Sequence, residues 1–123
     1  LAYFATAVAF SPAPDKAPFF ADFVTKDGKV DPLVEARWAA NAPTAMLPSY
    51  VPALKRMEAI ALDVGDKDFL LEDNKLMTRE LTRFGVTHSY TLYEGDHGNR
   101  IPQRFREQVL PFFAAHLDGP KKK

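Results

Sequence analysis

Three short apolar runs alternate with helical patterns along the chain, and this alternation is the feature that most constrains its fold. The runs lie at residues 6–11, 59–65 and 88–95, and each ends in turn-forming or acidic residues. The first two consist almost entirely of small and branched apolar residues, which is typical of strands covered on both faces. Strands separated by helices favour right-handed crossovers. We therefore expect an α/β fold with a three-stranded parallel sheet and flanking helices.

The helical patterns between and after these runs support that arrangement. Residues 70–84 carry apolar side chains at three-, four- and seven-residue spacings, and Gly85 follows as a left-handed C-cap. A second helix is expected over residues 102–117, with a kink at Pro111, because proline has no amide hydrogen to donate. Shorter elements are expected elsewhere, namely helices at 31–38 and 50–56 and a loop with a terminal turn at 12–29.

Length and charge limit the classes of protein to which the chain can belong. Its 123 residues suit a single domain over 1–123, in which the lysine-rich end, 118–123, is expected to be a basic flexible tail. Sixteen basic and sixteen acidic residues give no net charge, so we expect no nucleic-acid partner. The longest apolar run, residues 1–10, is about half of what a membrane-spanning helix needs, so we expect no membrane partner.

Two further features concern the cellular compartment and the first strand. There is no Cys, which excludes disulfides and thiolate chemistry and leaves a cytoplasmic or secreted location equally open for a soluble chain. The sequence starts inside an apolar segment, so nothing upstream in this chain can flank the strand at 6–11. We expect that strand to be covered by an upstream N-terminal segment or by a second copy, which makes a homodimer a possible partner arrangement.

Polar clusters follow the second and third expected strands. Asp63 lies near the end of the run at 59–65, Asp66 and Asp68 follow that run, and Asp96 and His97 follow the run at 88–95. Functional groups in open α/β sheets gather beyond the carboxyl ends of the strands. A carboxylate there can hydrogen bond to an imidazole on the neighbouring loop and stabilise the imidazolium when the ring acts as a base. We therefore predict an acid–histidine pair formed by Asp68 and His97.

These segments also resemble a known family. The runs Ala-Leu-Asp-Val-Gly-Asp-Lys-Asp-Phe-Leu, Tyr-Glu-Gly-Asp-His-Gly-Asn-Arg and Val-Leu-Pro-Phe-Phe are similar to the C-terminal part of an α/β-hydrolase, in the esterase branch that includes esterase D, S-formylglutathione hydrolase and feruloyl esterases. The resemblance implies that Asp68, in Gly-x-x-Asp, is the acid of a catalytic triad and that His97, in Gly-x-His, is its base. It also implies a carboxylic-ester hydrolase that acts on small-molecule esters and needs no cofactor or metal.

The chain departs from that family in lacking the nucleophile. The family uses a Gly-x-Ser-x-Gly elbow upstream of these motifs, and the sequence contains none. Ser11 is the substitute candidate for the nucleophile, and Asp66 is the substitute candidate for the acid. For Asp66 and for Asp68 the structural alternative is helix capping. As an isolated chain the protein is expected to be weakly active or inactive. The alternative function is a non-catalytic truncated α/β module that self-associates through its first strand.

Overall fold

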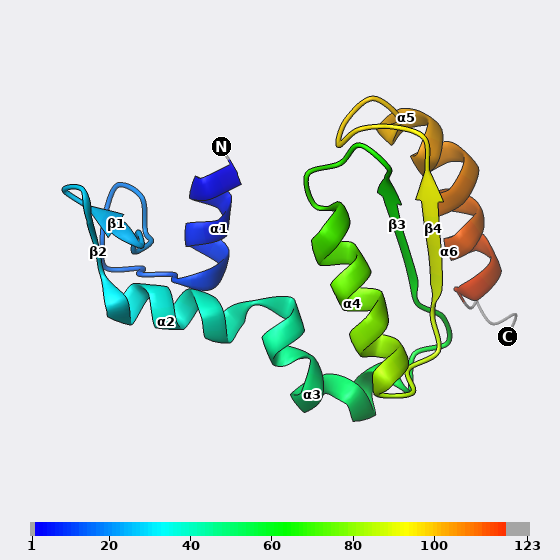
Figure 1. The fold of residues 1–123 in the computed structure, drawn as a ribbon, viewed down its shortest axis with the longest axis horizontal. Helices are drawn as coiled ribbons and strands as arrows, with labels where there is room; N and C mark the ends of the chain where they lie inside the picture. Colours follow the sequence, from blue (N-terminus) through cyan, green and yellow to red (C-terminus); the bar gives the residue numbers. More distant parts are fainter. Residues whose placement is uncertain (1, 118–123) are drawn as a thin grey trace, which may run out of the picture. The chain divides into compact units, whose positions relative to one another are not determined.

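The computed structural model describes residues 2–117, so the expected basic tail lies outside the described residues. The chain divides into two compact units, residues 1–49 and residues 50–123, which are treated separately below. Helices and small sheets occur in both, so the chain is a mixed α/β protein (Figure 1).

The predicted first strand is wrong, because residues 6–11 belong to a helix and its end. Helix α1 spans Ala2–Phe10, and four of its nine residues are alanine, the strongest helix former. A short apolar run has no periodicity that separates a strand from a buried helix, and among residues 2–117 no strand pairs with this segment. Residues 6–11 therefore do not form a strand through which a second copy of the chain could pair.

The remainder of the first unit is a hairpin followed by a helix. Strands β1 (Thr25–Lys26) and β2 (Lys29–Val30) pair antiparallel across Asp27 and Gly28, which both have positive φ. This confirms the turn that the sequence predicts, because Asp-Gly is the dipeptide that tolerates two left-handed residues. Helix α2 (Pro32–Asn41) begins where the sequence predicts it, with the Asp31 carboxylate accepting hydrogen bonds from the first-turn amides.

Helix α3 (Pro43–Leu54) begins earlier than predicted, because Pro43 supplies the fixed φ that suits a first helical residue.

The second unit contains the parallel strands that the sequence predicts. Strands β3 (Ala61–Gly65) and β4 (Ser89–Tyr93) pair in parallel along their full length. Helix α4 (Leu71–Arg83) connects them, and Figure 1 shows α4 on one face of the pair and α6 (Leu110–His116) on the other. Within residues 2–117 the parallel sheet has two strands rather than the expected three, since the segment assigned to the third is helix α1.

The end of α4 explains why the chain turns back into β4. Gly85 has a φ of +66°, its amide donates to the carbonyl of Thr82, and the next amide, from Val86, donates to the carbonyl of Leu81. This is the Schellman arrangement, which needs a left-handed residue and confirms the predicted glycine cap. Leu81 and Val86 are both buried, so the cap is anchored in the core of this unit.

The C-terminal helix is interrupted ahead of Pro111. Helix α5 (Ile101–Arg104) leads into a π-helical turn, Phe105–Val109, before α6 begins. Within that turn the amide of Leu110 donates to the carbonyl of Phe105, five residues back. The wider turn accommodates a proline that cannot donate, so the predicted disturbance occurs as a π-turn. No helix within residues 2–117 is long and apolar enough to cross a membrane.

Candidate acid–base site

The candidate site lies in the two loops that follow β3 and β4, at the carboxyl edge of the sheet. The amide of Asp66 donates to the carbonyl of Tyr93 at 2.8 Å, and the amide of Lys67 donates to the carbonyl of Gly95 at 2.9 Å. These bonds continue the strand pairing beyond the sheet. Gly65 allows the approach, because a Cβ at that position would lie 2.2 Å from the carbonyl oxygen of Gly95. The two loops are therefore held side by side by backbone contacts.

This arrangement brings the predicted acid and base together. Nδ1 of His97 lies 3.0 Å from Oδ2 and 3.2 Å from Oδ1 of Asp68. An ionised carboxylate only accepts hydrogen bonds, so Nδ1 carries the proton of this contact. The remaining ring nitrogen, Nε2, then has the free lone pair when the ring is neutral, which is the arrangement that a general base requires.

Asp68 is held rigidly while it contacts His97. Its side chain is 8% exposed, and Oδ1 also accepts a hydrogen bond of 2.8 Å from the amide of Leu70, just ahead of α4. Its backbone carbonyl accepts from the amide of Leu71 at 3.1 Å. Asp68 thus closes an Asx turn just ahead of α4 while it partners His97, and this bond helps to orient its carboxylate toward the imidazole. It is not the N-cap of α4, because that position is Leu70 and no side chain caps it.

His97 is accessible on its other side. Its side chain is 57% exposed, and within residues 2–117 no group hydrogen bonds to Nε2. One face of the ring packs against Phe69, with ring centroids 4.6 Å apart at an interplanar angle of 41°. The neutral ring therefore offers Nε2 as a proton acceptor on its accessible side, while Nδ1 is held by Asp68.

The loop that carries His97 is shaped by its neighbour Asp96. Oδ1 of Asp96 accepts hydrogen bonds of 2.8 Å from the amides of Gly98 and Asn99, and the Asn99 side chain accepts from the Asp96 amide at 3.1 Å. The two backbone donors lower the pKa of the Asp96 carboxyl from its ordinary value. Asp96 therefore stabilises the turn that presents His97 and does not contact the imidazole by hydrogen bonding.

Asp66, the predicted substitute acid, has a different role in this structure. Its Oδ1 accepts a hydrogen bond of 2.9 Å from the amide of Gly95, on the opposite loop. It joins the two loops that carry Asp68 and His97, and its carboxylate makes no hydrogen bond to the imidazole. Of the two aspartates, the structure thus brings Asp68 to His97 and uses Asp66 as a link between loops.

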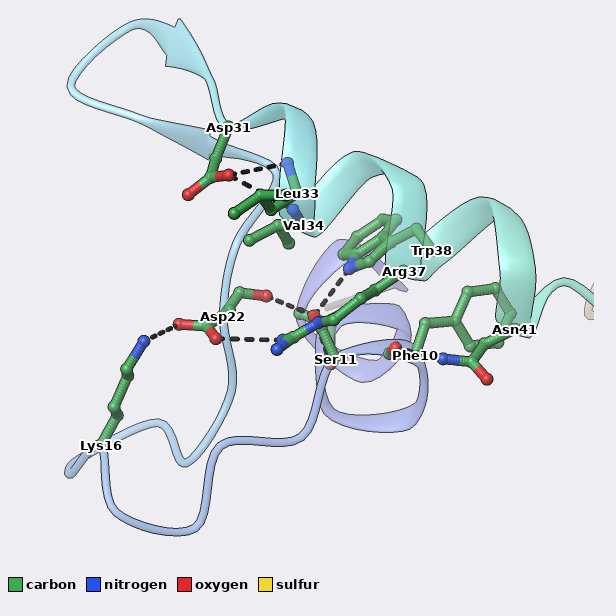
Figure 2. A network of polar contacts seen from close by, with 11 residues as sticks. Phe10, Ser11, Lys16, Asp22, Asp31, Leu33, Val34, Arg37, Trp38 and Asn41 are labelled. Carbon is green, nitrogen blue, oxygen red and sulfur yellow. Dashed lines mark hydrogen bonds and ion pairs between the residues drawn. The ribbon is translucent and has the colours of Figure 1, made fainter.

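Ser11, the predicted substitute nucleophile, lies in the first unit and is fully buried. Figure 2 shows it among its polar contacts. Its Oγ lies 2.5 Å from the carbonyl of Asp22 and 3.1 Å from that of Ala7, and it accepts a hydrogen bond of 2.7 Å from Nε1 of Trp38. A hydroxyl with its donor and acceptor capacity used, and no exposed surface, presents no nucleophile.

Neither of the other two serines, Ser49 and Ser89, lies beside His97 within the second unit. Ser89 is the first residue of β4, at the opposite end of the strand from His97, and a five-residue strand spans roughly 16 Å. Ser49 is an exposed residue of α3 in the first unit.

Sequence reasoning missed one neighbour of His97, namely Phe69. Its position directly after the acid is a weak signal, because an apolar residue there is also expected at the start of a helix. Within the described part of the chain, no group of three or more His, Asp or Glu side chains is arranged to hold a metal ion.

Comparison with known proteins adds no assignment to this geometry. No protein-family model matches the sequence, and no curated protein matches it. The relationship to α/β-hydrolases therefore stays a prediction from the motifs.

Proposed function

We propose that this chain supplies the acid and the base of a carboxylic-ester hydrolase of the α/β-hydrolase type. The observation that carries the proposal is the contact between the Asp68 carboxylate and Nδ1 of His97 on adjacent loops after two parallel strands. In this function Asp68 orients the imidazole and stabilises its protonated form. Small-molecule esters are the substrate class, and the chemistry requires no cofactor.

The proposed reaction proceeds through an acyl transfer in which His97 moves a proton. A hydroxyl oxygen attacks the ester carbonyl carbon while its proton passes to Nε2, and the imidazolium then returns a proton to the departing alkoxide as the carbon–oxygen bond breaks. The burial of Ser11 argues against it as the attacking group. We infer that the nucleophile is a serine outside these 123 residues, in the longer sheet of which β3 and β4 would be the last two strands.

An added alcohol can replace the missing serine in a direct test. The full chain is incubated with a p-nitrophenyl ester and increasing concentrations of a small alcohol, and p-nitrophenolate release and the new ester are both measured. We expect a component of the transfer rate that depends on the alcohol and is lost in His97→Ala. Because the His97 side chain is largely exposed, a small alcohol can reach it.

His116 provides the matched control for this experiment. Its Nδ1 lies 3.9 Å from the Glu58 carboxylate, too far for a hydrogen bond, although the ring is exposed and an acid is nearby. His116→Ala should therefore leave the transfer rate unchanged, and so should Ser11→Ala once folding is verified. Equal rates in the unmodified chain and in His97→Ala would exclude the proposed function.

A further inference from the structure

Phe69 is a large, exposed apolar side chain that lies against the imidazole of His97. It is 71% exposed, and its ring contact with His97 is the one aromatic contact that it makes among residues 2–117. A phenylalanine that contributed to the core of this unit would be buried, as Val64 and Leu81 are. Burial thus does not explain the position of the Phe69 ring, and the contact with the imidazole is its distinguishing feature.

The contact supplies a restraint that the hydrogen bond to Asp68 lacks. A hydrogen bond to two carboxylate oxygens at 3.0 and 3.2 Å restrains Nδ1 but leaves an exposed ring free to tilt about that contact. The Phe69 ring, with its centroid 4.6 Å from that of the imidazole, blocks one face of His97 and limits that tilt.

We propose that Phe69 is a positioning residue, which holds the imidazole of His97 so that Nδ1 faces Asp68 and Nε2 faces the reacting group. The inference rests on the proposed function for its role in catalysis. Its effect on the ring is a property of the folded chain, so it can be measured without a reaction. Because Phe69 is largely exposed, its replacement removes this contact without opening a cavity in the core.

The test compares Phe69→Ala and Phe69→Tyr with the unmodified chain. Long-range proton–nitrogen NMR spectra of the neutral imidazole report which nitrogen carries the proton, and the carbon-bound ring protons report shielding by a neighbouring aromatic ring. The alcohol-dependent transfer rate is measured on the same samples. Phe105→Ala is the matched control, because Phe105 is an exposed phenylalanine of the same unit, 53% exposed, whose ring does not contact that of His97.

In Phe69→Ala we expect the His97 nitrogen shifts to move toward the average of the two tautomers and its ring protons to lose their shielding. The transfer rate should fall about tenfold, since misplacement of a catalytic group by a fraction of an ångström has effects of this order. Phe69→Tyr should keep the spectrum and should keep the rate within about twofold, because it preserves the ring. Phe105→Ala should change neither.

An unchanged nitrogen spectrum in Phe69→Ala would overturn the inference, and so would a changed spectrum with an unchanged rate. If the unmodified chain shows no His97-dependent transfer at all, the proposed function fails. The nitrogen shifts then decide by themselves whether Phe69 orients the ring, so the two failures can be distinguished.

Discussion

The Ser11 cluster of the first unit and the Asp68–His97 pair of the second are both polar clusters, but their surroundings differ. Ser11 is completely buried, and its hydroxyl is engaged by Trp38 and by the carbonyl of Asp22 (Figure 2). His97 is 57% exposed, and one of its ring nitrogens is restrained while the other is open.

This difference separates a stabilising cluster from a chemical one. Most buried polar groups are hydrogen bonded, and a group that uses all its donors and acceptors in this way has no lone pair or proton for a substrate. Asp68 combines both conditions, because its buried carboxylate is fixed by the Leu70 amide and still faces an exposed ring. Whether an accessible atom has an unused lone pair therefore indicates chemical reactivity here better than the type of residue does.

The largest expected effect comes from changing the acid of the pair. In Asp68→Asn the side-chain amide can donate to Nδ1, which favours the wrong tautomer of His97. We expect the His97-dependent transfer rate to fall about a hundredfold, within the range of general acid–base contributions. The rate is measured with a p-nitrophenyl ester and an added alcohol, beside Asp66→Asn, which should keep the tautomer. A full rate in Asp68→Asn would show that the contact has no role in proton transfer.

A methyl group at Gly65 should disturb the second unit strongly. The added Cβ would lie 2.2 Å from the backbone oxygen of Gly95, so one of the two loops has to move. We expect Gly65→Ala to lower the free energy of unfolding by about 2 kcal/mol and to broaden the NMR signals of the His97 loop. Gly98→Ala is the matched control, because a Cβ there meets no atom nearer than 4.0 Å. Equal stability of the two variants would contradict the close approach.

Removal of the Ser11 hydroxyl should affect stability but not chemistry. In Ser11→Ala the indole N–H of Trp38 loses its acceptor, at a cost of about 1–2 kcal/mol because the indole is only partly buried. Trp38 is the single tryptophan of the chain, so its fluorescence during urea unfolding reports this unit. The transfer rate, measured without urea, should be unaffected. Loss of His97-dependent transfer in a folded Ser11→Ala would make Ser11 part of the site and remove the contrast between the regions.

The sequence predicts most of the second unit because its local signals agree. The strands at 59–65 and 88–95, the helix between them and the cap at Gly85 are each indicated by residues that act locally. The adjacency of Asp68 and His97 then follows from topology, since the carboxyl ends of neighbouring parallel strands meet at one edge. The candidate pair could thus be named from the sequence.

Long-range packing explains what could not be predicted. The apolar run before Ser11 suits a strand or a buried helix equally, and the local sequence pattern does not decide between them. The contact of Phe69 with His97 and the link from Asp66 to Gly95 join residues from different loops. No local pattern encodes such contacts, because they depend on the approach of two backbones at Gly65.

The smallest expected effect compares two carboxylates, the partly buried Asp22 in the first unit and the exposed Asp96 in the second. Hydrogen bonds from Lys16 and Arg37 lower the pKa of Asp22, with the Lys16 contribution the larger, and backbone amides lower the pKa of Asp96. A carboxyl whose folded pKa lies below its unfolded value, about 3.9, stabilises the fold above that pH and loses this contribution as the pH falls through the folded pKa.

Salt should distinguish the two carboxylates, because the screening length falls to about 3 Å at 1 M salt and exposed ion pairs weaken. We expect the stability difference between the unmodified chain and Asp22→Asn, followed by Trp38 fluorescence, to shrink in high salt at pH 7 and to be lost as the pH falls through the folded pKa of Asp22. The difference for Asp96→Asn, followed by the amide signals of Gly98 and Asn99, should resist salt because its partners are neutral amides in the same turn. Equal reductions of the two stability differences by salt would contradict this expectation, because ion pairing would then not distinguish Asp22 from Asp96.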